Sequence, residues 1–204
     1  FEDAVRKTYA AWAGHPGPEI RAAQVLSAVC RDRSYEPRVR AALDRYNAQP
    51  PTDLVRAFGG GGLPRQLPTR NWVCFFLART LGSLGEVASV DSLLAVLTRN
   101  GPELSNGSPE PDSPAVLFLH NELTPCYRAS AAYALGRIGD RRAVGVLLRV
   151  VGDLQNALDT RFAAAQALVA IGDPACVAEV RKLADGYPEV STRRMLLRLC
   201  SGQE

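Results

Sequence analysis

Two stretches near the end of the sequence repeat one pattern of small and apolar residues. When TRFAAAQALVAIGDPACVAEVRKL is laid under YRASAAYALGRIGDRRAVGVLL, Gly172 falls under Gly139, 33 residues away. A third copy, CFFLARTLGSLGEVASVDSLLAVL, places Gly85 in the same position, 54 residues before Gly139 because extra chain has been inserted. A recurring period of this length is the signature of a repeat architecture, in which each unit buries its apolar side against the next.

Each copy reads as two helices joined by a tight turn. Apolar residues spaced three and four apart give each helix one buried face. Gly139 and Gly172 supply the left-handed residue that ends the first helix, and Asp140 and Asp173 are suited to cap the second. Pro174 then stands in the first turn, where its missing N–H has no cost. The sequence therefore predicts stacked antiparallel helix pairs.

The repeated pattern resembles a known family. R-x-x-A-A-x-A-L-x-x-I-G-D-x-x-A-V-x-x-L begins at Arg128 and again at Arg161, with Cys176 replacing an alanine and Val180 replacing the last leucine. It is similar to HEAT repeats, and more narrowly to the short bacterial variety first named after phycobilin lyases. The resemblance is close over 124–186 and weaker in the third copy. It implies an all-α fold, a right-handed α-solenoid whose second helices line a concave face.

The N-terminal part of the chain is also predicted to be helical. PEIRAAQVLSAVCRD aligns with the repeat, and residues 18–31 are expected to form a degenerate repeat helix in which Cys30 takes the place of the turn glycine. Further helices are expected at 2–13, 37–47 and 52–58. We therefore expect a divergent helical part to precede the regular repeats.

Glycine and proline mark the boundaries of this organisation. GGGGLPRQLPT has four glycines and two prolines and is not expected to be helical. The predicted parts are an N-terminal helical segment, a Gly/Pro-rich connection, and a repeat region that contains an inserted loop: 1–58, 59–69, 70–204 and, for the loop, 100–123. A last helix is expected to act as a cap, with Met195, Leu196 and Leu199 inward and Arg193, Arg194 and Arg198 toward water.

Basic residues recur on the predicted second helices. Arg149 and Lys182 occupy equivalent positions in two copies, and Arg142 lies two turns before Arg149. On the concave face this stripe would bind an acidic peptide, a carboxylate or a phosphate backbone. The alternative is a solvated helix face whose cations pair with nearby carboxylates, namely Asp153, Glu179 or Asp185.

A second set of recurring charges is expected to be structural. Arg128 and Arg161 begin first helices, and the resemblance implies that such an arginine reaches the turn aspartate or carbonyl groups of a neighbouring repeat. With Asp140 and Asp173 they would form a structural ladder. The alternative role for these four residues is contact with a ligand.

The inserted loop at 100–123 is the most individual part of the sequence. Its first half is polar, and its second half carries an apolar run, Val116 to Leu119, followed by His120. Loops longer than about 12–15 residues in a compact array are usually functional or disordered. We expect His120 to lie at the rim of a binding face; a crossover that only packs is the alternative.

Little in the sequence indicates catalysis, a metal or a cofactor. Neither histidine, His15 or His120, has a nearby nucleophile, and the His-Glu dipeptides of HEAT-like metal hydroxylases are absent. Trp12, Trp72 and Asp91 could form a cleft like that of HEAT-like alkylbase glycosylases, although Trp72 more simply fills the core. Nothing marks a bilin pocket, so a lyase role is supported by the repeat alone.

Composition narrows the partner classes. No apolar run approaches the roughly 20 residues of a membrane span. The net charge of +3 and pI of 8.7 fall short of the dense basic clustering typical of nucleic-acid binding. Five widely spaced cysteines without a C-x-x-C pair indicate buried, reduced thiols and slightly favour a reducing cytoplasm.

The sequence thus favours a protein-interaction or scaffold module that binds another protein on its concave face and needs no cofactor. An enzyme or enzyme accessory, bilin-lyase-like or glycosylase-like, and a nucleic-acid-binding module remain the alternatives.

Overall fold

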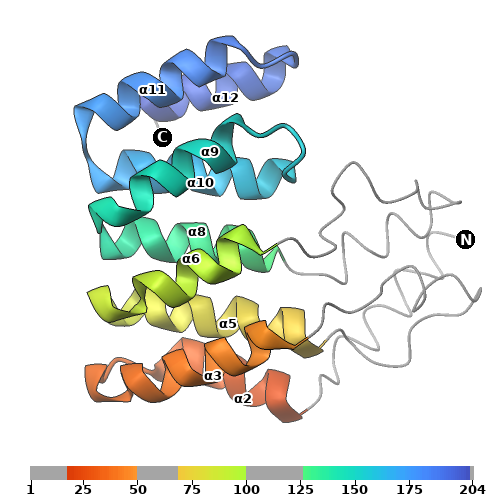
Figure 1. Cartoon of the computed structure of the whole chain (residues 1–204), viewed down its shortest axis with the longest axis vertical. Helices are drawn as coiled ribbons and strands as arrows, with labels where there is room; N and C mark the ends of the chain where they lie inside the picture. The colour runs from red at the N-terminus through yellow and green to blue at the C-terminus, as the bar shows by residue number, and fades with distance from the viewer. Residues whose placement is uncertain (1–17, 50–68, 100–125, 203–204) are drawn as a thin grey trace, which may run out of the picture.

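The computed structural model describes residues 18–49, 69–99 and 126–202. In these residues the chain forms nine α-helices and three short 3-10 turns, with no strand among them. The helices stack as successive hairpins along one axis (Figure 1). The all-helical solenoid predicted from the repeat is therefore confirmed.

Four hairpins follow one another, each made of a first and a second helix. They are hairpin 1, α2 (Pro18–Val29) and α3 (Glu36–Ala48); hairpin 2, α5 (Thr69–Leu84) and α6 (Val90–Thr98); hairpin 3, α8 (Tyr127–Ile138) and α9 (Val144–Gly152); and hairpin 4, α10 (Leu158–Ile171) and α11 (Pro174–Asp185). A last helix, α12 (Val190–Cys200), follows them. The 3-10 turns η1 (Arg33–Tyr35), η2 (Val87–Ser89) and η3 (Arg141–Ala143) lead into the second helices of hairpins 1 to 3.

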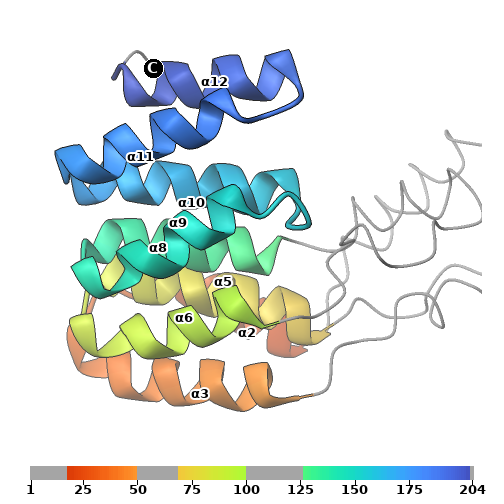
Figure 2. The ribbon, with the colours of Figure 1, turned by 45° about the horizontal axis from the view of Figure 1, so that its top comes forward.

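The two kinds of helix form two layers (Figures 1 and 2). In the first layer α5 packs between α2 and α8, and α10 packs on the other side of α8. In the second layer α6 contacts α3, and α9 contacts α11. Hairpin 1 therefore continues the same array as the regular repeats, in agreement with the degenerate repeat expected at 18–31.

Some sequence-based expectations lie outside the described residues. These are the helices at 2–13 and 52–58, the inserted loop at 100–123, and all of the connection at 59–69 except its last residue. Thr69, placed in that connection by the sequence, is instead the first residue of α5. A threonine followed by the apolar run of α5 is compatible with a helix start, so the boundary shifts by one residue.

Small residues set the close approach of the first helices. A Cβ on Gly82 would lie 2.8 Å from the Cα of Ala134, and a Cβ on Gly136 would lie 2.6 Å from the Cα of Ala167. Real Cβ atoms do not come so near to backbone, so these two positions exclude any side chain. The interfaces of hairpin 3 with hairpins 2 and 4 thus rest on glycine meeting alanine.

The turns follow the expected chemistry, with one variation in hairpin 1. Gly85, Gly139 and Gly172 have φ values of 72°, 76° and 77°, the left-handed region that favours glycine. Hairpin 1 has Cys30 after its first helix, and no described residue other than glycine has a positive φ. Its connection is therefore made without a left-handed residue.

Both predicted turn aspartates act as caps, Asp173 for α11 and Asp140 for the 3-10 turn η3 that leads into α9, and Asp32 caps η1 of hairpin 1. Asp140 accepts a hydrogen bond from the backbone N–H of Arg142 at 2.8 Å, and Asp173 accepts one from that of Ala175 at 3.0 Å. Asp32 does the same for Ser34 at 2.9 Å. Each carboxylate satisfies a backbone donor that the helix itself leaves unpaired.

Helix α12, the last helix of the described array, differs from the expected cap at Met195 and Arg193. Leu196 is buried and Leu199 half-buried, but Met195 is 40% exposed, which contradicts its predicted inward position. Arg193 is half-buried and donates from Nη2 to the Tyr187 carbonyl at 2.7 Å rather than pointing wholly to water. One helix packed in a corner between α11 and α10 buries a narrower stripe than a helix with neighbours on both sides.

None of the described helices combines the length and the apolar character that crossing a membrane would need. Their apolar residues face one another across the two layers instead. The residues with no exposure include Leu43, Leu81, Leu93, Tyr127, Leu135, Leu147 and Leu168.

Candidate functional site

The second helices carry a groove with a volume of about 710 Å³. It runs from the end of α6 across α9 to α11, so that three hairpins contribute to it. Its lining residues are Thr98, Arg128, Val146, Leu148, Arg149, Val150, Gly152, Asp153, Asn156, Glu179 and Leu183. The groove lies on the face where the resemblance placed the binding surface.

The walls of the groove combine apolar area with charges of both signs. Val146, Leu148 and Leu183 are half-buried, so part of each apolar side chain still faces the opening. Arg149 and Glu179 are exposed on α9 and α11 respectively. Such a surface offers an apolar centre with a charged rim, the arrangement that protein-binding patches typically have.

The polar end of the groove is held by hydrogen bonds. Arg128, 7% exposed, donates from Nε to the Leu97 carbonyl at 2.7 Å and from Nη2 to Asn156 Oδ1 at 2.7 Å. Asn156 in turn donates to Asp153 Oδ2 at 3.2 Å and to the Val150 carbonyl at 3.3 Å. Arg128 therefore caps the carboxyl end of α6 and fixes the segment that connects α9 to α10.

The structure separates the three residues of the predicted basic stripe. Arg149 lines the groove, and its guanidinium Nε donates only to the Gly145 carbonyl of its own helix, at 3.4 Å, among the contacts of the described residues. Lys182 lies on α11 beside the groove, 78% exposed, with its Nζ 3.7 Å from Glu179. Arg142 is not part of the groove.

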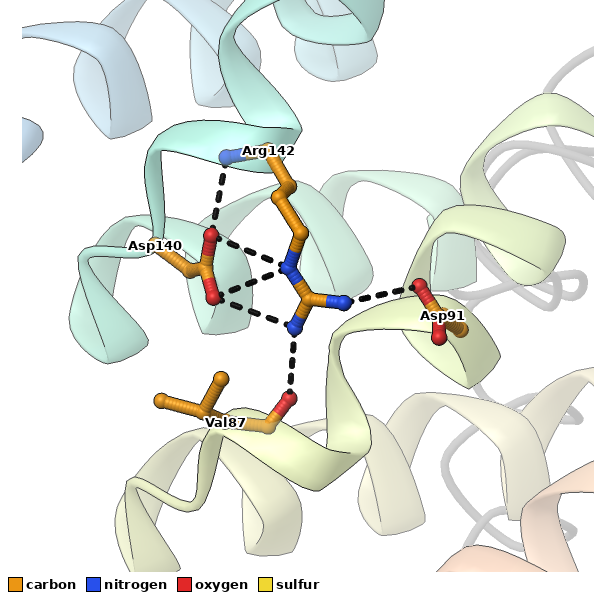
Figure 3. Close-up of polar contacts among 4 residues, drawn as sticks. All are labelled: Val87, Asp91, Asp140 and Arg142. Carbon is orange, nitrogen blue, oxygen red and sulfur yellow. Dashed lines mark hydrogen bonds and ion pairs between the residues drawn. The ribbon is translucent and has the colours of Figure 1, made fainter.

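Arg142 instead lies in η3 and links two hairpins (Figure 3). Its guanidinium donates from Nε and Nη2 to Asp140 Oδ2, each at 3.1 Å. Nη1 lies 3.5 Å from Asp91 Oδ1 in α6, and Nη2 also donates to the Val87 carbonyl at 3.2 Å. The hydrogen bonds from the Arg142 side chain and backbone lower the pKa of Asp140, and those with Asp140 raise the pKa of Arg142. Through these contacts the Arg142 side chain joins hairpin 3 to hairpin 2, which is a structural role.

Two other ion pairs link the same edge of the array. Arg33 of η1 lies 3.2 Å from Glu86 of hairpin 2, and Arg141 of η3 bonds to Asp173 of hairpin 4. Arg33 and Arg141 each directly follow the residue that caps their turn. In hairpin 2 the residue after the turn cap is Val87, which has no charge. The link between hairpins 2 and 3 is made instead by Arg142 of hairpin 3, which donates to the Val87 carbonyl.

The four residues expected to form one ladder thus belong to two separate edges. Asp140 and Asp173 follow the ends of α8 and α10, whereas Arg128 and Arg161 lie near the starts of these helices. A helix of 12 residues is about 18 Å long, which separates Arg128 from the turn aspartates, but Arg128 does reach a carbonyl group of a neighbouring hairpin, that of Leu97, as the resemblance implied. The partners of the aspartates, Arg141 and Arg142, were not singled out for this role in the sequence, although their places beside the caps were a visible signal.

Arg161 has surroundings different from those of Arg128. Its guanidinium lies 5.1 Å from the ring centroid of Tyr187, whose hydroxyl donates to the Val151 carbonyl. Val151 is the repeat equivalent of Leu97. The Tyr187 hydroxyl therefore donates to the carbonyl equivalent to the one that receives the Arg128 hydrogen bond one hairpin earlier. Burial raises the pKa of the Tyr187 phenol. Arg70 stacks on Tyr127 at the same 5.1 Å, which repeats this motif at the other side of hairpin 3.

The other sequence candidates do not converge on a site in the described residues. Trp72 packs on Phe76 and Phe75 at the edge of the core, with ring centroids 5.9 and 6.1 Å away, whereas Asp91 belongs to the Arg142 contact. Trp12, His15 and His120 lie outside these residues. No cluster of histidine, cysteine and acidic side chains able to hold a metal occurs within 18–49, 69–99 and 126–202. None of the five cysteines, all of which are among the described residues, forms a disulfide, and burial raises the pKa of Cys74 to about 11.

Comparison with known proteins agrees with this geometry. Residues 114–198 match the family model for HEAT repeats. This region of the chain consists of HEAT repeats. This match covers hairpins 3 and 4 and most of α12, and HEAT repeats commonly mediate protein–protein interaction or scaffolding. No curated protein shows a significant match to the chain.

Proposed function

We propose that this HEAT-repeat chain is an interaction or scaffold module that binds a segment of a partner protein in the groove between α9 and α11. The observation that carries the proposal is the groove itself, about 710 Å³, which is partly apolar and lies on the second-helix face. Arg149 is the main charged contact, and Lys182 extends the site along α11.

The residues around Arg149 define the chemistry of the partner. A carboxylate on the partner would pair with the Arg149 guanidinium, which no acidic side chain of the described residues contacts. The groove also holds Asp153 and Glu179, so a partner with acidic residues alone would meet repulsion at these points. The best match is an apolar segment with a carboxylate opposite Arg149 and a cation opposite Glu179.

Arg142 has no place in this binding site because its guanidinium is occupied by Asp140, Asp91 and Val87. His120, proposed for the rim of the binding face, belongs to the part of the chain that the structure does not describe. The proposed site therefore consists of the groove residues with Arg149 and, at its edge, Lys182.

Charge reversal tests the proposal. The chain and its R149E/K182E variant would be used as baits in cell extract, and recovered proteins would be quantified by mass spectrometry. We expect a partner whose recovery falls about tenfold with the variant, since loss of a central interface arginine costs on the order of 1–2 kcal/mol.

The matched control is R38E/R137E, which makes the same change of charge at two exposed arginines outside the groove. This control should recover the partner as well as the unchanged chain does. If R149E/K182E and the unchanged chain recover the same proteins in equal amounts, the groove is not the binding site.

A further inference from the structure

The outer side of α12 forms a second surface, distinct from the groove. A shallow depression of about 390 Å³ lies along this helix, lined by Val190, Arg193, Arg194, Leu197, Arg198 and Ser201. Helix α12 packs on α11 and α10 through its other side, where Thr192 and Leu196 are buried. Helix α12 stands at one end of the described stack in Figure 2. The residues that line the depression lie on the side of this helix opposite Thr192 and Leu196.

The spacing of these residues gives α12 a line of exposed Val190, half-buried Leu197 and exposed Ser201, with cations beside it. Val190, Leu197 and Ser201 are seven and then four residues apart, so they lie on one side of the helix. Val190 is 64% exposed. Arg194 and Arg198, one turn apart, lie beside this line on one side of it and are exposed as well.

These two arginines have no acidic partner within the described residues. Their guanidinium groups take part in none of the hydrogen bonds or ion pairs found there, and no carboxylate lines the depression. Arg193 is different, because its Nη2 donates to the Tyr187 carbonyl at 2.7 Å. Among the described residues, the positive charge of this surface that has no acidic partner is therefore that of Arg194 and Arg198.

The same surface differs from the interfaces inside the array. There, Gly136 meets Ala167 so closely that no side chain fits between the helices. A purely apolar helix laid on α12 would have to bury the guanidinium groups of Arg194 and Arg198 without partners, which is costly. A ligand of this surface must therefore bring its own carboxylates.

We propose that Val190, Arg194, Leu197 and Arg198, here called the end face, bind an amphipathic acidic helix of a partner protein. Apolar residues seven apart on that helix would cover Val190 and Leu197, which are about 10.5 Å apart along α12. Its carboxylates would pair with Arg194 and Arg198, because each guanidinium offers a carboxylate two parallel N–H donors. This is the binding of a helix by its apolar face, with charge deciding which helix is accepted.

A designed peptide probes the end face without knowledge of the natural partner. The probe is a fluorescein-labelled helical 18-mer with leucine at positions seven apart and glutamate on both flanks, and its counterpart carries lysine in place of each glutamate. Binding would be measured by anisotropy at low salt, where charge pairing is least screened. We expect the acidic peptide to bind at least tenfold more tightly than the basic one.

The R194E/R198E variant should lose at least tenfold in affinity for the acidic peptide. R38E/R137E, with the same change of charge elsewhere, should bind it as the unchanged chain does, and so should the groove variant R149E/K182E. The last comparison keeps this proposal separate from the proposed groove. Circular dichroism would check folding, and R194Q/R198Q, which removes charge without reversing it, serves if the first variant unfolds.

Several results would overturn the proposal. Equal binding of both peptides, or equal binding of the acidic peptide by R194E/R198E, would show that the end face does not select carboxylates. A labelled oligonucleotide that binds this face more tightly than the acidic peptide would assign it to nucleic acid instead. Sedimentation of the unchanged chain as a dimer that R194E/R198E dissociates would make the end face a self-association surface.

Discussion

At the scale of single residues, a glycine of the first layer is required by packing, whereas a glycine of the second layer is not. Gly136 of α8 is enforced by packing, because a Cβ there would lie 2.6 Å from the Cα of Ala167. Gly145 of α9 meets no such limit, because a Cβ there would have no atom within 4 Å. Residues 141–143 continue into α9 as a 3-10 turn, so Gly145 lies inside a helical run where glycine is unfavourable.

Replacing each of these glycines by alanine should therefore change stability in opposite directions. We expect Gly136→Ala to lower the free energy of unfolding by about 1–3 kcal/mol through overpacking against α10. Gly145→Ala should raise it by up to about 1 kcal/mol, because alanine has the higher helix propensity and fits without contact. Urea unfolding followed by circular dichroism measures both changes, and a stabilised G136A would contradict the packing of α8 on α10.

At the scale of the element, Asp32, Asp140 and Asp173 cap the turns that start the second helices of hairpins 1, 3 and 4, and ion pairs join these turns to neighbouring hairpins. Asp173 does both for α11, since it accepts the Ala175 N–H and bonds to Arg141. We expect Asp173→Ala to lower the free energy of unfolding by about 0.5–2 kcal/mol through loss of the cap.

Asp173→Asn separates the two contributions. Asparagine caps helices about as well as aspartate but cannot form the ion pair, which is worth at most about 1 kcal/mol at an exposed pair. Because Arg141 is 76% exposed, we expect Asp173→Asn to have the smaller effect of the two in thermal unfolding. An equal loss in both variants would mean that the ion pair, and not the cap, holds the start of α11.

The turns were predictable from the sequence because their chemistry is local. A left-handed residue at Gly139 and a capping carboxylate at Asp140 are required by a helix end and a helix start next to each other. The pairing of Arg142 with Asp91 was not predictable in the same way. It depends on how hairpin 3 is rotated on hairpin 2, and apolar periodicity defines which face is buried but not which exposed side chains meet.

At the scale of the whole molecule, the array is a row of neighbours with a well-covered middle and a thinner end. Helix α8 lies between α5 and α10 and buries residues along its whole length, whereas α12 has neighbours on one side and buries only Thr192 and Leu196. The sequence predicted a binding surface on the second helices because the second helices of a solenoid share one face, and the groove lies in this layer. It named Asp153 and Glu179 as possible partners of the basic residues, and Lys182 does lie 3.7 Å from Glu179. That both acids line one groove with Arg149 could not be predicted, since this depends on the stacking of α9 against α11.

In such a row, stability is approximately a sum over hairpins and their nearest interfaces, so a core mutation should act according to its place. Leu135 and Leu196 are both buried, at 0% and 2% exposure, and truncation of a buried leucine to alanine costs about 2–5 kcal/mol. We expect Leu196→Ala to speed hydrogen exchange in α12 while α8 remains protected, since α12 can separate without opening hairpin 3. Leu135→Ala should instead speed exchange in α5, α8 and α10 together, because the interfaces on both sides of α8 are weakened. Exchange measured by mass spectrometry resolves these segments, and loss of protection in α8 in the Leu196→Ala variant as large as that in α12 would mean that the hairpins unfold as one cooperative unit.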